Sequence, residues 1–172
     1  MLKIIGSFIV IVATTIIGFY YAGIYVERVK QIRAIQYALN VLESEIVYTS
    51  TPLADAFKSV GEKSNEPFKR LFSNLSENLR NKNIESVANA FKAATENLKG
   101  EIYFQKEELE VIDSFMKSLG NTDVEGQKKN FNITIKKLEA FELKAEESRR
   151  KNEKLFKYLG ISCGMLVVII LG

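Results

Sequence analysis

Side chains suited to acid–base or nucleophilic chemistry are few in this 172-residue sequence, and their spacing does not favour catalysis. There is no histidine, and the single cysteine, Cys163, lies in an apolar run. Acid pairs occur at Glu43/Glu45 and Glu107/Glu108. On a helix, residues one or two apart point in different directions, so neither pair would converge on a reacting atom. We therefore interpret these carboxylates as solvated side chains and predict no catalytic residues.

Motifs that bind cofactors, metals or nucleic acids are also missing from the sequence. It contains no phosphate-binding loop, no dinucleotide-type glycine pattern and no nucleophile with a histidine base. Without histidine and with one cysteine, neither a Cys/His metal site nor a disulfide can be built. The net charge of +3 is small and interspersed with acid, which argues against a nucleic-acid surface. An enzyme is the least supported class of function, and we predict no cofactor.

Two apolar runs lie near the ends of the chain. The run Ile4–Val26 has no charged side chain and, at about 1.5 Å per residue, extends about 35 Å, enough to span a bilayer. A secretory signal peptide is the alternative, but the run exceeds a usual signal core and no clear cleavage site precedes Glu27. The second run, 158–172, also has no charge. We predict transmembrane helices at 1–26 and 158–172 and a domain at 27–157.

Basic residues indicate the orientation. Outside Lys3, the basic residues nearest the apolar runs all lie on the side of the central domain: Arg28, Lys30, Arg33, Arg149, Arg150, Lys151, Lys154 and Lys157. Because loops rich in lysine and arginine stay in the cytosol, residues 27–157 should be cytosolic and both ends should lie across the membrane.

The central domain shows only helical periodicity. Apolar residues recur three and four positions apart, and no segment alternates with period two. We predict an all-α fold, a cytosolic bundle of about six helices between the two transmembrane helices. The first helix continues from the first span to about Tyr48, and the last is continuous with the second span. Between them we expect four helices. Their start signals are Thr51 as N-cap with Pro52, then Pro67, Asn83 as N-cap, and about Glu101. Gly100 ends the third of these helices and Gly120 ends the fourth.

The start of the last helix has two possible caps. Thr122 with Glu125 matches a capping box, while Asp123 could instead cap onto Gly126. A glycine in the first turn costs about 1 kcal/mol against alanine. Gly126 therefore suggests close packing of a neighbouring backbone or an interface, although a merely tolerated glycine is the alternative.

Small residues four apart occur in both apolar runs, Gly18/Ala22 in the first and Gly160/Gly164 in the second. Such pairs let membrane helices approach closely, so we take these four as candidate helix-packing residues. Small residues are also common in membrane helices without such a role.

Three motifs make the chain resemble the stage III sporulation protein AB family over essentially its whole length. They are Glu27-Arg28-x-x-Gln31-Ile32-Arg33, Ala38-Leu39-x-x-Leu42-Glu43-x-Glu45-Ile46-x-Tyr48-x-x-Thr51-Pro52-Leu53, and Leu119-Gly120-x-x-Asp123-x-x-Gly126-Gln127. The resemblance implies a helical domain similar to the F component of type II secretion and type IV pilus systems. It also implies a place in the channel joining mother cell and forespore, in the outer forespore membrane.

The partners implied by the resemblance are the secretion-ATPase-like sporulation protein AA and other membrane proteins of the same complex. Within the matching motifs we take five residues as candidates for partner binding: Arg33, Glu43, Glu45, Asp123 and Gln127. The favoured hypothesis is a non-enzymatic membrane platform that docks the ATPase. The alternative is a membrane-tethered signalling or adaptor protein, against which the almost absent extracytoplasmic sequence argues.

Overall fold

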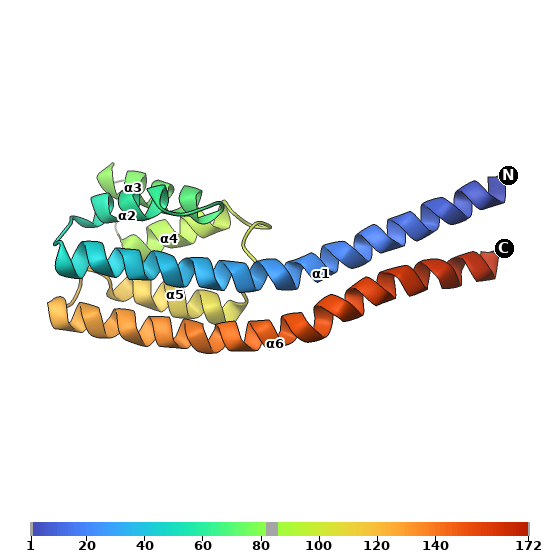
Figure 1. Ribbon diagram of the computed structural model, residues 1–172. Helices are drawn as coiled ribbons and strands as arrows, with labels where there is room; N and C mark the ends of the chain where they lie inside the picture. The colour runs from blue at the N-terminus through green and yellow to red at the C-terminus, as the bar shows by residue number, and fades with distance from the viewer. Residues whose placement is uncertain (1, 82–85, 172) are drawn as a thin grey trace. The chain divides into compact units, whose positions relative to one another are not determined.

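The computed structural model describes residues 2–81 and 86–171, and every regular element among them is a helix (Figure 1). The predicted all-α class, with about six helices, is confirmed. The elements are α1 (Leu2–Glu43), a π-helical segment (Ser44–Tyr48), α2 (Leu53–Glu62), α3 (Phe68–Arg80), α4 (Val87–Glu96), α5 (Lys106–Ser118) and α6 (Val124–Leu171). As predicted, the first helix runs from the apolar end into the central domain, and the last helix runs without a break through the second apolar run.

The chain divides into two units, each with its own internal contacts. Residues 30–142 form one unit, which we call the bundle, and residues 1–29 with 143–172 form the other, which we call the helix pair. Both predicted membrane segments, 1–26 and 158–172, fall within the helix pair, which also includes residues 143–157.

The bundle has a core of large apolar side chains. Helix α2 packs against α3, α3 against α4, and α4 against α5. The apolar stripes predicted from three- and four-residue spacing supply the core, which includes Leu39, Leu42, Phe57, Phe72, Leu75, Phe91, Ile112, Phe131 and Leu138. Burial of these stripes explains the helical periodicity, because each helix places one face on the core.

Two predicted helix starts are wrong in detail. Pro52, not Thr51, occupies the N-cap of α2, and the Thr51 hydroxyl donates instead to Glu45 Oε2 at 3.0 Å. Helix α5 begins at Lys106 rather than near Glu101. There the backbone N–H of Gln105 donates to Glu108 Oε2 at 2.6 Å, which satisfies a donor that the helix itself leaves open. Local side-chain hydrogen bonds therefore accompany both shifted boundaries.

The polar segments around α4 also differ from prediction. The predicted cap Asn83 lies outside the described residues, and α4 begins at Val87 with the Ser86 hydroxyl accepting from Asn89 N–H at 3.2 Å. The helix ends at Glu96, before Gly100, whose φ of 91° places it in the left-handed region of the following turn. Gly120 follows α5 with φ 82°, the predicted left-handed position after a helix end.

Among the described residues, one helix is long and apolar enough to cross a membrane by length and composition, within Gly6–Tyr48. It contains the first predicted span. The second run offers fourteen described residues from Tyr158 to Leu171, fewer than the roughly 20 that a bilayer-spanning helix needs. The second span stays a prediction.

Candidate docking surface

The structure places the candidate partner-binding residues at two positions in the bundle. Glu43 is the last residue of α1 and Glu45 lies in the π-helical segment that follows, while Asp123 immediately precedes α6 and Gln127 lies in its first turn. These two ends are adjacent, because the Lys128 ammonium lies over the Tyr48 ring, 6.0 Å from its centroid. We call this region the α1–α6 end.

Arg33 does not belong to the α1–α6 end. Its Nε donates to Glu142 Oε1 at 2.6 Å, and Gln36 donates to the other oxygen of the same carboxylate at 3.0 Å. Arg33 thus joins α1 to α6 within the bundle, and a docking role for it remains a prediction.

Glu45 connects the π-helical segment to α2. Its carboxylate accepts from Ser59 at 2.5 Å, from Thr51 at 3.0 Å and from Lys63 at 3.2 Å. These bonds stabilise the ionised form, the Ser59 hydroxyl most strongly, and hold the pKa of Glu45 below its ordinary value. The carboxylate is engaged inside the domain, so the solvated interpretation does not describe it.

Glu108 was also interpreted as solvated, and that interpretation is wrong. Its side chain is completely buried, and it accepts the Gln105 N–H at the start of α5. A buried carboxylate needs such donors to remain stable.

Asp123 caps α6. Its Oδ1 accepts the Gly126 N–H at 2.9 Å, which decides between the two caps that the sequence allowed. The same contact explains Gly126: a Cβ there would lie 2.8 Å from Asp123 Oδ1 and 3.0 Å from Thr122 Cβ. The expectation of a neighbouring backbone is therefore wrong, because the crowding comes from the cap in the same turn. The expectation of an interface at Gly126 stays a prediction.

The Gln127 side chain is buried in the bundle. It is 6% exposed, and its Oε1 has no hydrogen-bond partner within the described part of the chain. A partner would reach this oxygen only if the first turn of α6 moved. Its role in docking remains a prediction.

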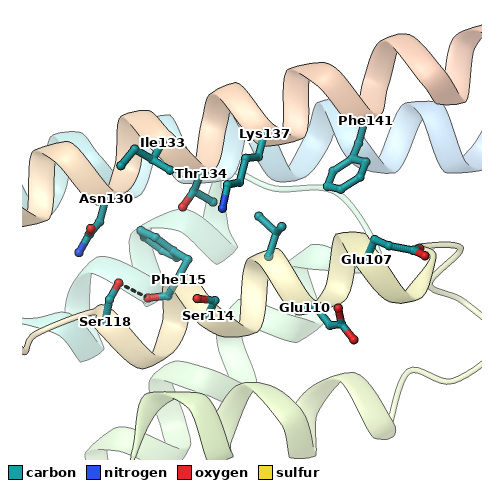
Figure 2. Close-up of a pocket in the computed structure, with 11 residues that line it drawn as sticks. Glu107, Glu110, Ser114, Phe115, Ser118, Asn130, Ile133, Thr134, Lys137 and Phe141 are labelled. Carbon is teal, nitrogen blue, oxygen red and sulfur yellow. Dashed lines mark hydrogen bonds between the residues drawn. The ribbon is translucent and has the colours of Figure 1, made fainter.

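A hollow of about 400 Å³ lies between α5 and α6 (Figure 2). Glu107 and Glu110 come from α5, and Lys137 comes from α6, with Ile133 and Phe115 nearer the other end of the hollow. Ser118 donates to the Phe115 carbonyl at 2.8 Å. The lining mixes acid, base and apolar groups without a nucleophile–base pair, so this hollow offers contact chemistry rather than catalysis.

Among the described residues, no group of three or more His, Cys, Asp or Glu is arranged to hold a metal.

The candidate membrane-packing residues meet within the helix pair. A Cβ on Gly18 would lie 2.6 Å from the Phe156 carbonyl oxygen and 2.9 Å from the Gly160 Cα. A Cβ on Gly164 would lie 2.5 Å from Thr14 Oγ1, and Ala22 is completely buried. Phe156 stacks on Tyr21 and Tyr25, with ring centroids 5.7 and 5.8 Å apart. The two segments touch within one chain, while their role in a bilayer stays a prediction.

Sequence reasoning missed Tyr48, Lys128 and Ile133 as candidates for contact. Tyr48 lies in a matching motif and is 68% exposed, and Ile133 is 44% exposed and borders hollows on both sides of α6. The available signal was an aromatic residue just before the Thr51-Pro52 helix break. The sequence gives no sign that lysines on α6 would surround Ile133.

Comparison with known proteins identifies the family. The family model described as stage III sporulation protein AB matches residues 3–172. A curated stage III sporulation protein AB from Bacillus subtilis (strain 168) is 37% identical over 171 residues, covering 99% of both chains. A solved structure of stage III sporulation protein AB is 33% identical with a TM-score of 0.66, covering 73% of this chain and 98% of that one. These descriptions indicate no catalytic activity. The chain belongs to the stage III sporulation protein AB family.

Proposed function

We propose that this protein is a non-enzymatic membrane component of the channel complex between mother cell and forespore, and that it docks a secretion-type ATPase. Its family membership supports a role in sporulation. The two apolar segments would span the mother-cell-derived outer forespore membrane, and the bundle would lie in the cytosol. Catalysis would come from the ATPase, the protein AA implied by the family resemblance.

The observation that carries this proposal is the exposure of apolar side chains in the helix pair. Large residues face outward along both helices, including Phe8, Ile16, Ile17, Met165, Leu166 and Ile170. In water such a surface would be costly, whereas in lipid it costs nothing. An exposed apolar surface on the helix pair, joined to a bundle with its own buried core, is the arrangement expected of a membrane-anchored docking domain.

Docking can be tested with the full chain in nanodiscs of phosphatidylcholine. We expect purified protein AA from the same organism to bind discs that contain the chain and not empty discs, and the chain alone to hydrolyse no ATP. Equal retention of the ATPase by empty and loaded discs would overturn the proposal.

Topology needs a separate test. A reporter active only in the cytosol should be active when inserted at Asn81-Lys82 and silent when fused after Gly172. The opposite pattern would exclude a cytosolic bundle, and activity at both positions would exclude the second span.

A further inference from the structure

Most basic side chains of the bundle already have an acidic neighbour. Carboxylate oxygens lie within 4.0 Å of, among others, Arg33, Lys58, Lys63, Arg70, Arg80 and Lys117. Six described lysines of the bundle have no carboxylate of a described residue at that distance: Lys69, Lys92, Lys128, Lys129, Lys136 and Lys137. Four of the six lie on the first turns of α6, so the uncompensated positive charge is concentrated there.

Three of these lysines border a single hollow. A depression of about 680 Å³ on α6, which we call the basic groove, has seven lining residues: Glu125, Gly126, Lys128, Lys129, Asn132, Ile133 and Lys136. Lys129, Asn132, Ile133 and Lys136 follow the i, i+3, i+4, i+7 pattern, which places them on one face of the helix. Glu125 lies beyond 4.0 Å of each described basic side chain. The charge of the groove is therefore positive.

One apolar side chain lines the basic groove, and an aromatic ring lies beside one of its lysines. Ile133 is 44% exposed in the middle of the lysines, and Tyr48, 68% exposed, lies under the Lys128 ammonium. A concave surface with an apolar residue among charges is typical of a protein interface, where an anchor side chain is buried and charges form the rim. The lining contains no arginine, the side chain that best matches phosphate in two-point contacts.

We propose that the basic groove receives an acidic amphipathic segment of a partner protein, with carboxylates against Lys128, Lys129 and Lys136 and an apolar side chain against Ile133. This inference rests on the proposed docking function and assigns its surface. Opposite charges would steer the encounter, and the apolar contact would slow dissociation. The α1–α6 end would then act in docking through Tyr48 and Lys128, while Asp123 holds the first turn of α6 in place.

The test uses the full chain in phosphatidylcholine nanodiscs and purified protein AA as the probe. The variant Lys129→Glu/Lys136→Glu should bind at least about tenfold more weakly, because each lost ion pair is replaced by repulsion. The matched control is Lys69→Glu/Lys92→Glu, which changes the charge equally at two other exposed lysines. It should bind like the unmodified chain. If the charge reversal disturbs folding, the neutral variant Lys129→Gln/Lys136→Gln tests the same two lysines without adding negative charge.

Carbodiimide crosslinking gives a second readout on the unmodified complex, because it joins a lysine amine to a touching carboxylate as an amide with loss of water. Mass spectrometry should find these links between the lysines of the basic groove and acidic residues of protein AA. Unchanged affinity of the groove variants, or links only at Lys69 or Lys92, would overturn the groove while leaving docking intact. Absence of any binding by the unmodified chain would overturn both. Binding to vesicles of anionic phospholipid is measured with the same variants. If the groove variants lose binding to these vesicles but keep their affinity for protein AA, the lysines bind lipid and the proposal is overturned.

Discussion

In the bundle, Phe57, Phe72 and Phe131 are completely buried, whereas in the helix pair Phe8, Ile16 and Ile170 are more than half exposed. The bundle has its largest apolar side chains inside. In the helix pair the two helices approach one another at Gly18, Gly160 and Gly164, where an added Cβ would lie 2.6, 2.8 and 2.5 Å from the nearest atom of the other helix. Removal of apolar surface from water drives the first kind of packing, and close backbone approach drives the second where the solvent is itself apolar. This difference is the one expected if the bundle faces water and the helix pair faces lipid, as we propose.

Replacing phenylalanine by alanine should therefore affect stability strongly in the bundle and hardly at all in the helix pair. Phe131→Ala removes a fully buried ring whose centroid lies 4.8 Å from that of Phe115. We expect it to lower the free energy of unfolding by about 3–5 kcal/mol and the melting temperature by about 10 °C or more. Phe8→Ala, at an exposed position in the helix pair, should leave the melting temperature nearly unchanged. Thermal unfolding in nanodiscs, followed by circular dichroism, measures the melting temperatures of both variants. Equal decreases in melting temperature would contradict the difference in packing between the bundle and the helix pair.

Glycine substitutions should act mainly in the helix pair. In Gly160→Ala the new Cβ would lie 2.8 Å from the Thr14 carbonyl oxygen, a backbone atom that cannot rotate away. We expect a cost of about 1–3 kcal/mol for the packing of the two helices. Gly23→Ala is the control, because nothing lies within 4 Å of its added Cβ. Spin labels at positions 12 and 159, in a Cys163→Ser background, should show a broader distance distribution for Gly160→Ala only. Identical distributions in the two variants would argue against glycine-mediated packing.

Gly126, at the cap of α6 in the bundle, should respond to substitution differently from the glycines of the helix pair. Asp123→Ala should cost about 1 kcal/mol, while Asp123→Asn should be nearly neutral. Gly126→Ala alone should bring little gain, since the added Cβ displaces the cap carboxylate and offsets a helix propensity advantage of up to about 1 kcal/mol. In the Asp123→Ala background, Gly126→Ala should stabilise. Chemical unfolding of the unmodified chain, Asp123→Ala, Gly126→Ala and the double variant gives the coupling free energy between the two positions. If the two changes in unfolding free energy simply add, the cap does not explain the glycine at 126.

The smallest effect concerns acid stability. The folded-state pKa of Glu45 is lowered, so the Glu45 bonds stabilise the bundle above the ordinary carboxyl pKa of 4.5, and this stabilisation is lost as the pH falls through the folded-state value. Glu45→Gln should lower the melting temperature at pH 7. At pH 3 the melting temperatures of the variant and the unmodified chain should lie closer together. Melting curves at both pH values check this. A difference that grows on acidification would give the contribution the wrong sign.

Apolar spacing was enough to predict the helices, because burial imposes the helical period on residues such as Leu39, Leu42 and Phe72. Local signals were less reliable where distant side chains competed. Thr51 has the sequence context of an N-cap, but Glu45 takes its hydroxyl. Gly120 was predicted correctly because its left-handed backbone needs no distant partner.

The candidate site was harder to predict because ion pairing depends on the fold. Glu125 stands four residues before Lys129, a favourable spacing on a helix, yet the two do not form an ion pair in the structure. By contrast, Arg33 forms an ion pair with Glu142, which lies 109 residues later in the sequence. The basic groove becomes visible only after such pairs have been assigned in three dimensions.

The measurement that tests the account most directly is membrane fractionation of sporulating cells that carry Lys129→Glu/Lys136→Glu as the only copy of this protein. The substitutions lie in the bundle and leave the helix pair unchanged. We expect the variant to stay in the membrane fraction in normal amount while protein AA leaves that fraction. Retention of protein AA in the membrane fraction at the level of unmodified cells would contradict docking at the basic groove, because anchoring and docking would then not be separated as proposed.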